Sequence, residues 1–260
     1  MNPSLKSIDL NADVGEKPTA LSDGTEESLI RIITSANIAC GGHAGDDDSM
    51  QSVVGLCRDH GVAVGAHPGF PDKAGFGRTF LNMPPLELES SIRSQVLALQ
   101  RVASSMGVPL RHVKPHGALY NASATNASIA ASIAHAVASI NQDLILVGLA
   151  GSRMLDVWAA EGFAVIGEAF ADRRYEADGS LRSRRFPDAL ITDADEAARQ
   201  ALQIATGGAI RAMNGTTLRI EARTICVHGD TENAATIARA VRHALEESGV
   251  VVRSVSSLPC

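Results

Sequence analysis

The chain alternates between short apolar segments and longer segments in which apolar residues recur every three or four positions. The short segments have the length and composition of buried β-strands. They cover Ser7–Asn11, Ala36–Ala39, Ala63–Ala66, His112–Lys114, Leu144–Leu149, Ala164–Glu168 and Thr224–Val227. A further run, Ala189–Ile191, indicates either an extra strand or part of a long loop.

The longer segments have the periodicity of amphipathic helices. The clearest covers Leu86–Met106, and Gly107 with Pro109 marks its end. Three further helices are expected over Ser49–His60, Ile129–Ile140 and Ile237–Leu245.

Strands that alternate with helices predict a parallel sheet covered by helices. About seven strands within 260 residues favour a single α/β domain over residues 1–260, a TIM-like barrel. The alternative is an open, doubly wound sheet, whose first strand would be followed by a glycine-rich turn. The segment Asn11–Glu16 has no GxGxxG pattern, so the barrel is favoured.

Composition narrows the class of protein. The formal charge is −6, and the densest basic stretch, Arg182–Arg185, is short and lies near Asp178 and Asp188, so nucleic acid is not an expected partner. Cys40, Cys57, Cys226 and Cys260 form no CxxC pair, which fits a reducing compartment. No apolar run reaches the roughly 20 residues of a membrane helix, and the first residues leave no room for a signal peptide. We expect a cytoplasmic protein with no membrane contact.

Polar side chains gather where the predicted strands end. In a parallel barrel all these positions lie at the C-terminal face, so residues distant in sequence converge on one pocket. They are Asn11, Asp13, Glu16, Asn37, His43, Asp46, His67, Arg78, Lys114, His116, Glu168, Asp172, Arg173, His228 and Asp230. A single histidine after a strand is most often a structural residue, but histidines at four separate strand ends indicate a site.

These residue types support two kinds of chemistry. Asp and His from separate strands can bind a divalent metal that activates water. Alternatively, they act without metal as general bases, while Lys or Arg holds a carboxylate or a developing oxyanion. No HExxH or other compact ligand motif decides between the two, and if a metal is bound, Asp13, His43 and His116 are its expected ligands.

Nucleophilic catalysis is less favoured. No GxSxG motif is present, and Cys40 is better explained as a small buried residue at a strand end than as a thiol nucleophile. The sequence also contains no GxxxxGK[ST], so the chain has no P-loop of its own for ATP.

Six motifs together resemble the signature blocks of the LamB/YcsF family. In chain order they are LNADVGE, SANIACGGHAGD, GAHPGFPD with GFGR, VKPHGALYN, FADRRY with DG, and CVHGD. They extend from about Ile8 to the C-terminal helix, so the resemblance spans nearly the whole chain.

The resemblance implies a seven-stranded TIM-like barrel related to glycoside hydrolase and deacetylase barrels. It also implies the role of the A subunit in an ATP-dependent 5-oxoprolinase, which opens 5-oxo-L-proline to L-glutamate together with its B and C subunits. On this interpretation ATP is used with the partner subunits.

The candidate residues divide into two roles on this interpretation. The catalytic candidates are Asp13, His43, His67, Lys114, His116 and Asp230. The substrate-binding candidates are Asn11, Glu16, Asn37, Asp46, Arg78, Glu168, Asp172, Arg173 and His228. We expect Asp13 and His116 to activate water, or to bind the metal if there is one, and Lys114 or Arg173 to orient the substrate carboxylate.

The chain departs from the family pattern at three places. Gly42 stands where an aromatic residue is usual, Asp47 where proline is usual, and Thr79 where a second arginine is usual. These departures affect the shape of the pocket and the substrate preference, not the barrel. Two other functions remain open: a metal-dependent deacetylase, and a non-catalytic subunit that delivers substrate.

Overall fold

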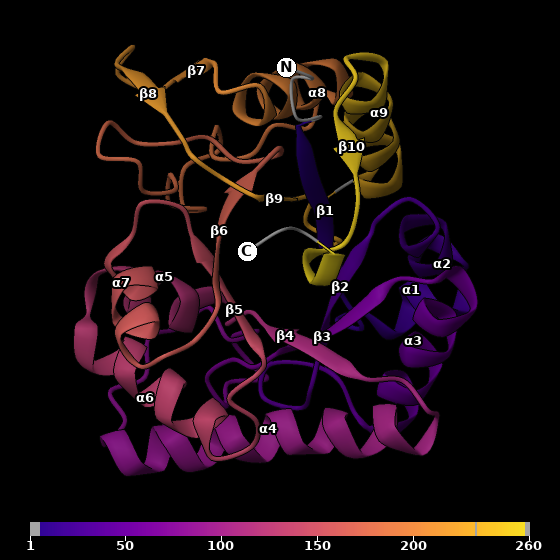
Figure 1. Cartoon of the computed structure of the whole chain (residues 1–260), viewed down its shortest axis with the longest axis vertical. Helices are drawn as coiled ribbons and strands as arrows, with labels where there is room; N and C mark the ends of the chain where they lie inside the picture. Colours follow the sequence, from indigo (N-terminus) through magenta and orange to yellow (C-terminus); the bar gives the residue numbers. More distant parts are fainter. Residues whose placement is uncertain (1–5, 232, 258–260) are drawn as a thin grey trace, which may run out of the picture.

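The computed structural model describes residues 6–231 and 233–257, so Cys260 lies outside the described residues. Seven parallel strands form a barrel (Figure 1). They are β1 (Ser7–Val14), β2 (Ser35–Ala39), β3 (Ala63–His67), β4 (Leu110–Val113), β5 (Ile145–Leu149), β6 (Val165–Phe170) and β9 (Thr224–Cys226). Each strand pairs with the next, and β9 pairs with both β6 and β1, which closes the barrel. The predicted barrel is confirmed, and the doubly wound alternative is wrong.

Helices surround the barrel on its outer side (Figure 1). They are α1 (Pro18–Ser22), α2 (Thr25–Ile30), α3 (Asp47–His60), α4 (Pro85–Ser105), α5 (Gly117–Thr125), α6 (Ala127–Ala138), α7 (Arg153–Ala160), α8 (Ala194–Ala205) and α9 (Ala234–Glu247). The four helices predicted from periodicity correspond to α3, α4, α6 and α9. Smaller elements complete the chain: the antiparallel pair β7 (Ala209–Arg211) and β8 (Thr217–Arg219), the strand β10 (Val251–Val252) and the 3-10 turn Val255–Ser257.

Local sequence explains where the helices begin and end. Asp46 caps α3 by accepting from the Ser49 backbone N–H, and Gly61 ends the helix in a left-handed conformation. The buried residues of α4 recur every three or four positions and pack against the barrel wall; they include Leu88, Ile92, Val96 and Leu99.

The strand β1 shows how the barrel separates polar from apolar residues. Ile8, Leu10, Ala12 and Val14 alternate with polar residues and belong to the hydrophobic core under the helices. Asp9, Asn11 and Asp13 take the other face, inside the barrel, where they are buried and bonded to neighbouring strands. The interior of this barrel is therefore a polar network rather than a stack of aliphatic side chains.

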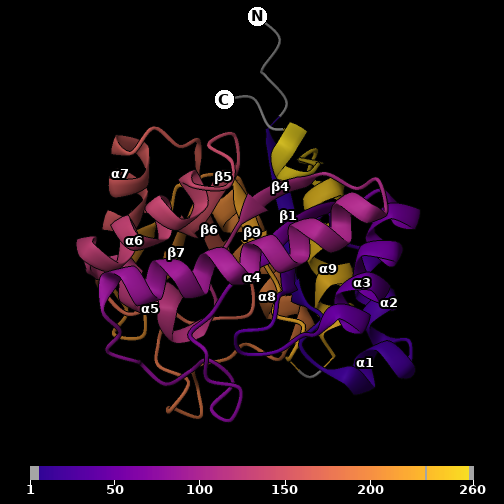
Figure 2. The same cartoon turned by 90° about the horizontal axis from the view of Figure 1, so that it is seen from below.

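Two expectations for strands change with the structure. The first strand continues to Val14, three residues beyond the predicted end, so Asp13 belongs to the strand and pairs with Asn37 of β2. The segment Ala189–Ile191 belongs to a long loop after β6, where Leu190 makes an isolated bridge with Arg173. This loop and the loop after β3 extend from the same end of the barrel, at the lower edge of Figure 2.

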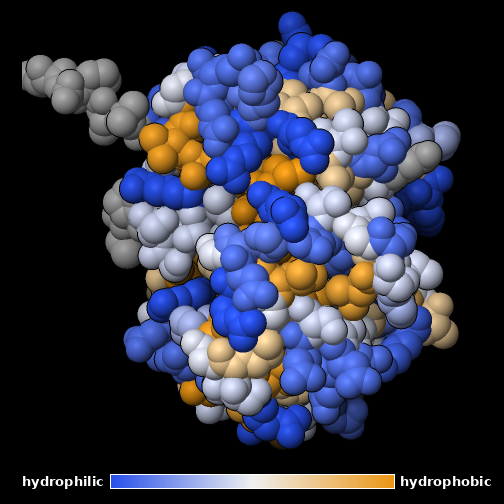
Figure 3. All heavy atoms as spheres, turned by 90° about the vertical axis from the view of Figure 1, so that its right-hand side faces the viewer, coloured by the Kyte–Doolittle hydropathy of each residue, from blue (hydrophilic) through white to orange (hydrophobic). Residues whose placement is uncertain are grey.

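The outer surface over α2, α3 and α9 is mostly hydrophilic, with small separate hydrophobic patches (Figure 3). Within the described part of the chain, no helix combines the length and apolar character needed to cross a membrane.

Candidate active site

The loops that follow the strands enclose a cavity of about 810 Å³, which we call the main cavity. Four of the five residues expected to converge at this face line it: Asp13, His67, His116 and His228. The fifth, His43, lies behind His116, and the two rings stack with 3.6 Å between their centroids. The barrel topology thus gathers side chains from β1, β3, β4 and β9 at one place.

Glu16, His43, His67 and His116 form a compact group, which we call the histidine–glutamate cluster. Glu16 Oε1 lies 3.0 Å from His43 Nε2 and 3.1 Å from His116 Nδ1. His67 Nε2 lies 2.9 Å from His116 Nδ1 and 3.7 Å from Glu16 Oε1.

The outward nitrogens of two cluster histidines have backbone partners. His67 Nδ1 donates to the Lys114 carbonyl at 2.8 Å, and His116 Nε2 donates to the Phe76 carbonyl at 2.9 Å. A carbonyl only accepts hydrogen bonds, so each of these nitrogens carries its proton. The inward nitrogens, His67 Nε2 and His116 Nδ1, are thereby directed at Glu16.

Burial and charge shift the pKa values of the cluster members in different directions. Burial lowers the pKa of His43 to about 4 and also lowers the pKa of His116. Burial acts to lower the pKa of His67 as well, but the Asp13 and Glu16 carboxylates together outweigh it and raise the pKa of His67. For Glu16, burial acts to raise the pKa, but hydrogen bonds from His116 and His43 outweigh it and lower the pKa.

Lys114 follows β4 and is buried inside the barrel. Its Nζ lies 2.8 Å from Asp13 Oδ1 and 2.8 Å from Glu168 Oε1, and it donates to Cys226 Sγ at 3.1 Å. Burial acts to lower the pKa of Lys114, but Asp13, Cys226 and Glu168 together outweigh it and hold the pKa well above its usual range. All three N–H groups of this ammonium have partners, so Lys114 positions Asp13 and Glu168 and has no free donor for a substrate carboxylate.

Asp13 has one engaged and one accessible oxygen. Oδ1 accepts from Lys114 and from the Asn37 side chain at 2.9 Å, whereas Oδ2 lies 3.4 Å from His67 Nε2 at the wall of the main cavity. Burial acts to raise the pKa of Asp13, but His67 and Lys114 outweigh it and hold the pKa well below its usual range. Asp13 is therefore an ionised carboxylate with one oxygen directed toward its histidine neighbour.

Three expected substrate-binding residues lie beneath the cavity, inside the barrel: Asn11, Asn37 and Glu168. Asn11 donates to Glu168 and Thr224, and Asn37 donates to Asn11 and Asp13. Neither asparagine lines the main cavity. Their amides join the strands and support the ion pairs above them.

Arginines form one side of the main cavity. Arg78 and Arg184, from the loops after β3 and β6, both donate to the carboxylate of Asp230 after β9. Asp230 is thus engaged in joining three loops. Arg173 is 6% exposed and donates through Nη2 to the Arg182 carbonyl, and its buried Nε has no partner among the described residues.

The remaining candidates lie at the edge of the site or outside it. Asp172 does not line the main cavity; its carboxylate accepts from His228 at 2.9 Å and from Thr231, which orients the His228 ring against Phe170. Asp46 lies apart, because its side chain is exposed and caps α3.

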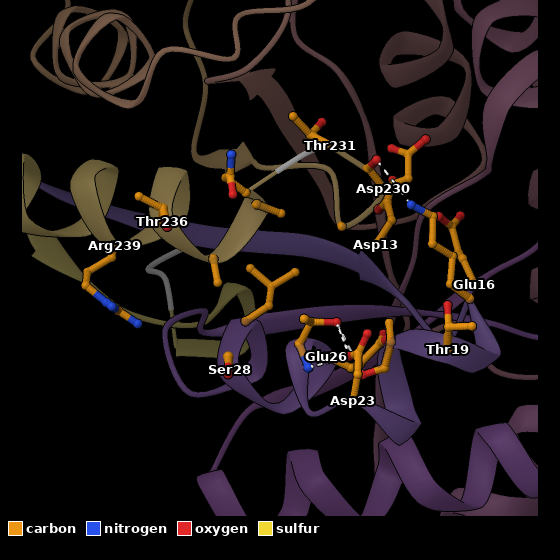
Figure 4. Close-up of a pocket in the computed structure, with 18 residues that line it drawn as sticks. Asp13, Glu16, Thr19, Asp23, Glu26, Ser28, Asp230, Thr231, Thr236 and Arg239 are labelled. Carbon is orange, nitrogen blue, oxygen red and sulfur yellow. Dashed lines mark hydrogen bonds between the residues drawn. The ribbon is translucent and has the colours of Figure 1, made fainter.

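A second cavity of about 520 Å³ opens between α1, α2 and the start of α9 (Figure 4). Asp13, Glu16 and Asp230 line both cavities and therefore form the wall between them. Ser28, Thr236 and Arg239 lie at the far end of this second cavity (Figure 4).

The departures from the family pattern have structural correlates. A methyl group on Gly42 would meet Gln95 Oε1 at 2.2 Å, so the Gln95 side chain takes the space beside Gly42. Gln95 uses that position to bond both the N–H and the carbonyl of Gly69. Thr79 lines the main cavity, and Asp47 is an exposed residue in the first turn of α3.

Sequence reasoning missed several residues of the site. Tyr120 lines the main cavity and donates to Glu168 Oε2 at 2.8 Å, Phe170 stacks on His228, and Arg184 binds Asp230. The motif VKPHGALYN contains Tyr120, but this residue lies on α5, away from the strand ends where site residues were expected. Cys40, by contrast, is buried, and burial raises its pKa to about 12, which does not suit a thiolate nucleophile.

Comparison with known proteins places this site within a family. The family described as LamB/YcsF matches residues 8–259. A protein from Chloroflexus aggregans, named as the A subunit of 5-oxoprolinase, is 52% identical over 250 residues, which cover 96% of this chain and 99% of that protein. A protein of the same name from Bordetella parapertussis is 46% identical over 254 residues, covering 98% of this chain and all of that protein. The crystal structure of a lactam utilization protein from Thermus thermophilus is 42% identical, with a TM-score of 0.88 over 95% of this chain and 99% of the other. The chain belongs to the LamB/YcsF family.

Proposed function

We propose that this chain is the A subunit of a cytoplasmic, ATP-dependent 5-oxoprolinase, which hydrolyses 5-oxo-L-proline to L-glutamate together with its B and C subunits. The observation that carries the proposal is the main cavity, where an ionised Asp13 and the histidine–glutamate cluster face a buried arginine. The full-length relatives named as the A subunit of 5-oxoprolinase support the choice of substrate.

The substrate is a five-membered lactam that carries one carboxylate. Arg173 suits that carboxylate, because it lines the cavity and its buried Nε has no partner among the described residues. Burial lowers the pKa of Arg173 to about 10, so the guanidinium remains charged at neutral pH. A fixed guanidinium recognises a carboxylate through paired hydrogen bonds.

Asp13 is the group that removes a proton from the attacking water. Its Oδ1 is fixed by Lys114, while Oδ2 is directed toward His67 at the cavity wall. As water adds to the lactam carbonyl carbon, Asp13 takes one proton and the carbon–nitrogen bond breaks. Asp13 then returns this proton to the ring nitrogen as it becomes the amine of glutamate.

The unactivated lactam resists this attack, because its amide is stabilised by resonance and the amine of the product stays close to the carboxyl group. Phosphorylation of the amide oxygen by ATP makes the carbon electrophilic. Addition of water and cleavage of the carbon–nitrogen bond then give an acyl phosphate, and a second water releases inorganic phosphate and leaves the carboxylate of glutamate. The sequence has no P-loop, so we assign this activation to the B and C subunits and the hydrolytic step to this barrel.

Reconstitution tests the proposal. Glutamate formation from 5-oxo-L-proline is measured with this chain alone, with the B and C subunits alone, and with all three, each with and without ATP. We expect rapid glutamate formation only with all three subunits and ATP. Rapid turnover by this chain alone without ATP, or activity confined to acetylated substrates, would contradict the proposal.

A further inference from the structure

Three potential ligand atoms converge at the wall of the main cavity. His116 Nδ1 lies 2.9 Å from His67 Nε2 and 3.1 Å from Glu16 Oε1, and His67 Nε2 lies 3.7 Å from Glu16 Oε1. Four-coordinate zinc binds nitrogen and oxygen ligands at about 2.0–2.2 Å, which places neighbouring ligand atoms roughly 3.3 Å from one another. The triangle therefore has the size of one face of a tetrahedral metal site.

The hydrogen bonds of His67 and His116 to backbone carbonyls leave the ring nitrogens that face Glu16 available for a metal. His67 Nδ1 and His116 Nε2 each donate to a backbone carbonyl, so in the neutral rings His67 Nε2 and His116 Nδ1 are lone-pair donors. Metal-binding histidines typically donate their other ring N–H in this way, which fixes the tautomer and the ring orientation.

Glu16 also has an outer partner. His43 Nε2 lies 3.0 Å from Glu16 Oε1, and the His43 ring is held by stacking on His116. A hydrogen bond to a ligating carboxylate orients it in the same way that a carbonyl orients a histidine. Each of the three ligand atoms thus belongs to a side chain that a neighbouring group holds in place.

We propose that Glu16, His67 and His116 bind one divalent transition-metal ion, with Zn²⁺ as the preferred type, and leave one position open toward the main cavity. Two histidines and one glutamate with an open position are a ligand set of catalytic zinc sites. An ion bound here would supply a Lewis acid to the cavity. This set differs from the Asp13, His43 and His116 expected from the sequence, because Asp13 lies outside the histidine–glutamate cluster and its Oδ1 pairs with Lys114, and because His43 lies behind Glu16 and His116.

A second group of possible ligands, Asp13, Cys226 and His228, is a weaker candidate. The Lys114 ammonium lies 2.8 Å from Asp13 Oδ1 and 3.1 Å from Cys226 Sγ, so a cation already balances these groups. Burial also raises the pKa of Cys226 well above its usual range, which opposes the thiolate that a metal requires.

Metal affinity tests the inference directly. The full chain is stripped with a chelator and titrated with Zn²⁺ by calorimetry, and with Co²⁺ by visible absorption, which reports four-coordinate geometry. We expect one ion per chain. Loss of an outer partner typically weakens metal binding 10- to 100-fold, so His67→Ala and Glu16→Gln, which remove ligands, should weaken it at least about 100-fold.

His228→Ala is the matched control, because His228 lines the same cavity but contributes to the second group. We expect it to retain wild-type affinity. Circular dichroism checks folding, and zinc-edge anomalous scattering from crystals locates the ion if a variant fails to fold. The inference is overturned if folded wild-type chain binds neither ion, or if binding is lost in His228→Ala and kept in His67→Ala.

The inference concerns the same site as the proposed hydrolysis but rests on the ligand geometry alone. Affinity is measured without lactam, ATP or partner subunits. A failure of metal binding therefore leaves the reconstitution result untouched, and a failure of reconstitution leaves the metal measurement untouched.

Discussion

Lys114 carries its charge inside the barrel with 2% of its side chain exposed, and two carboxylates make that position possible. Removal of one partner from a buried ion pair typically costs 3–5 kcal/mol, because the other charges are left without compensation. We expect Lys114→Met to lower the free energy of unfolding by roughly 3–5 kcal/mol, measured by urea denaturation at pH 7.

Lys73→Met is the control for that experiment, since Lys73 is exposed and its loss should change stability by no more than about 0.5 kcal/mol. A Lys114→Met protein as stable as this control would show that Asp13 and Glu168 do not depend on the ammonium.

Glu26 gives a pH-dependent prediction. Its carboxyl is 6% exposed and accepts from the Gly15 N–H, and burial raises its pKa from 4.5 to about 7. Because the folded-state pKa is the higher one, this group destabilises the fold progressively as pH rises from about 4.5 to 7, by about 3 kcal/mol once it is fully ionised.

Glu26→Gln removes that ionisation while keeping an acceptor for Gly15. We expect the variant to be more stable than wild type at pH 8, and the difference to shrink toward zero near pH 4.5, in urea titrations of metal-free protein. A stability difference that does not change with pH would contradict the assignment.

At the scale of elements, Gln95 links α4 to the loops after β2 and β3. It bonds Gly69 twice and takes the space beside Gly42. We expect Gly42→Ala to lower stability by roughly 1–3 kcal/mol through overpacking. In a Gln95→Ala background the same change should cost less, because the clashing side chain is gone, and a double-mutant cycle measures this coupling. Strict additivity of the two changes would show that Gln95 and Gly42 do not interact.

Periodicity was sufficient to predict α3, α4, α6 and α9 and the seven strands of the barrel, because each has a regular apolar pattern over its length. It did not predict the helices α1, α2, α5, α7 and α8. It also ended β1 at Asn11, because the polar residues at the end of that strand point into the barrel instead of toward solvent. A strand end whose polar residues point into the barrel cannot be recognised from the pattern of apolar residues.

At the scale of the whole molecule, parallel topology explains why residues from four strand ends could be expected at one face. The sequence could not show that Asn11 and Asn37 lie below the cavity, since their depth depends on how far each strand extends. It could not show the ion pairs of Arg78 and Arg184 with Asp230 either, because these contacts join three loops of irregular structure. The site residues could be predicted from their positions after strands, whereas the side chains that each of them contacts could be identified only from the folded structure.

The rate of glutamate formation by the assembled enzyme carrying Asp13→Asn tests the central claim, that this cavity performs the hydrolysis. Removal of a general base typically lowers the rate 10²- to 10⁴-fold, and we expect a loss in that range with folding intact. Asp9→Asn is the matched control, because Asp9 is a buried, inward-facing residue of the same strand that lies outside the main cavity, and it should retain turnover. Wild-type turnover by the Asp13→Asn enzyme would contradict the account and favour a subunit that only delivers substrate.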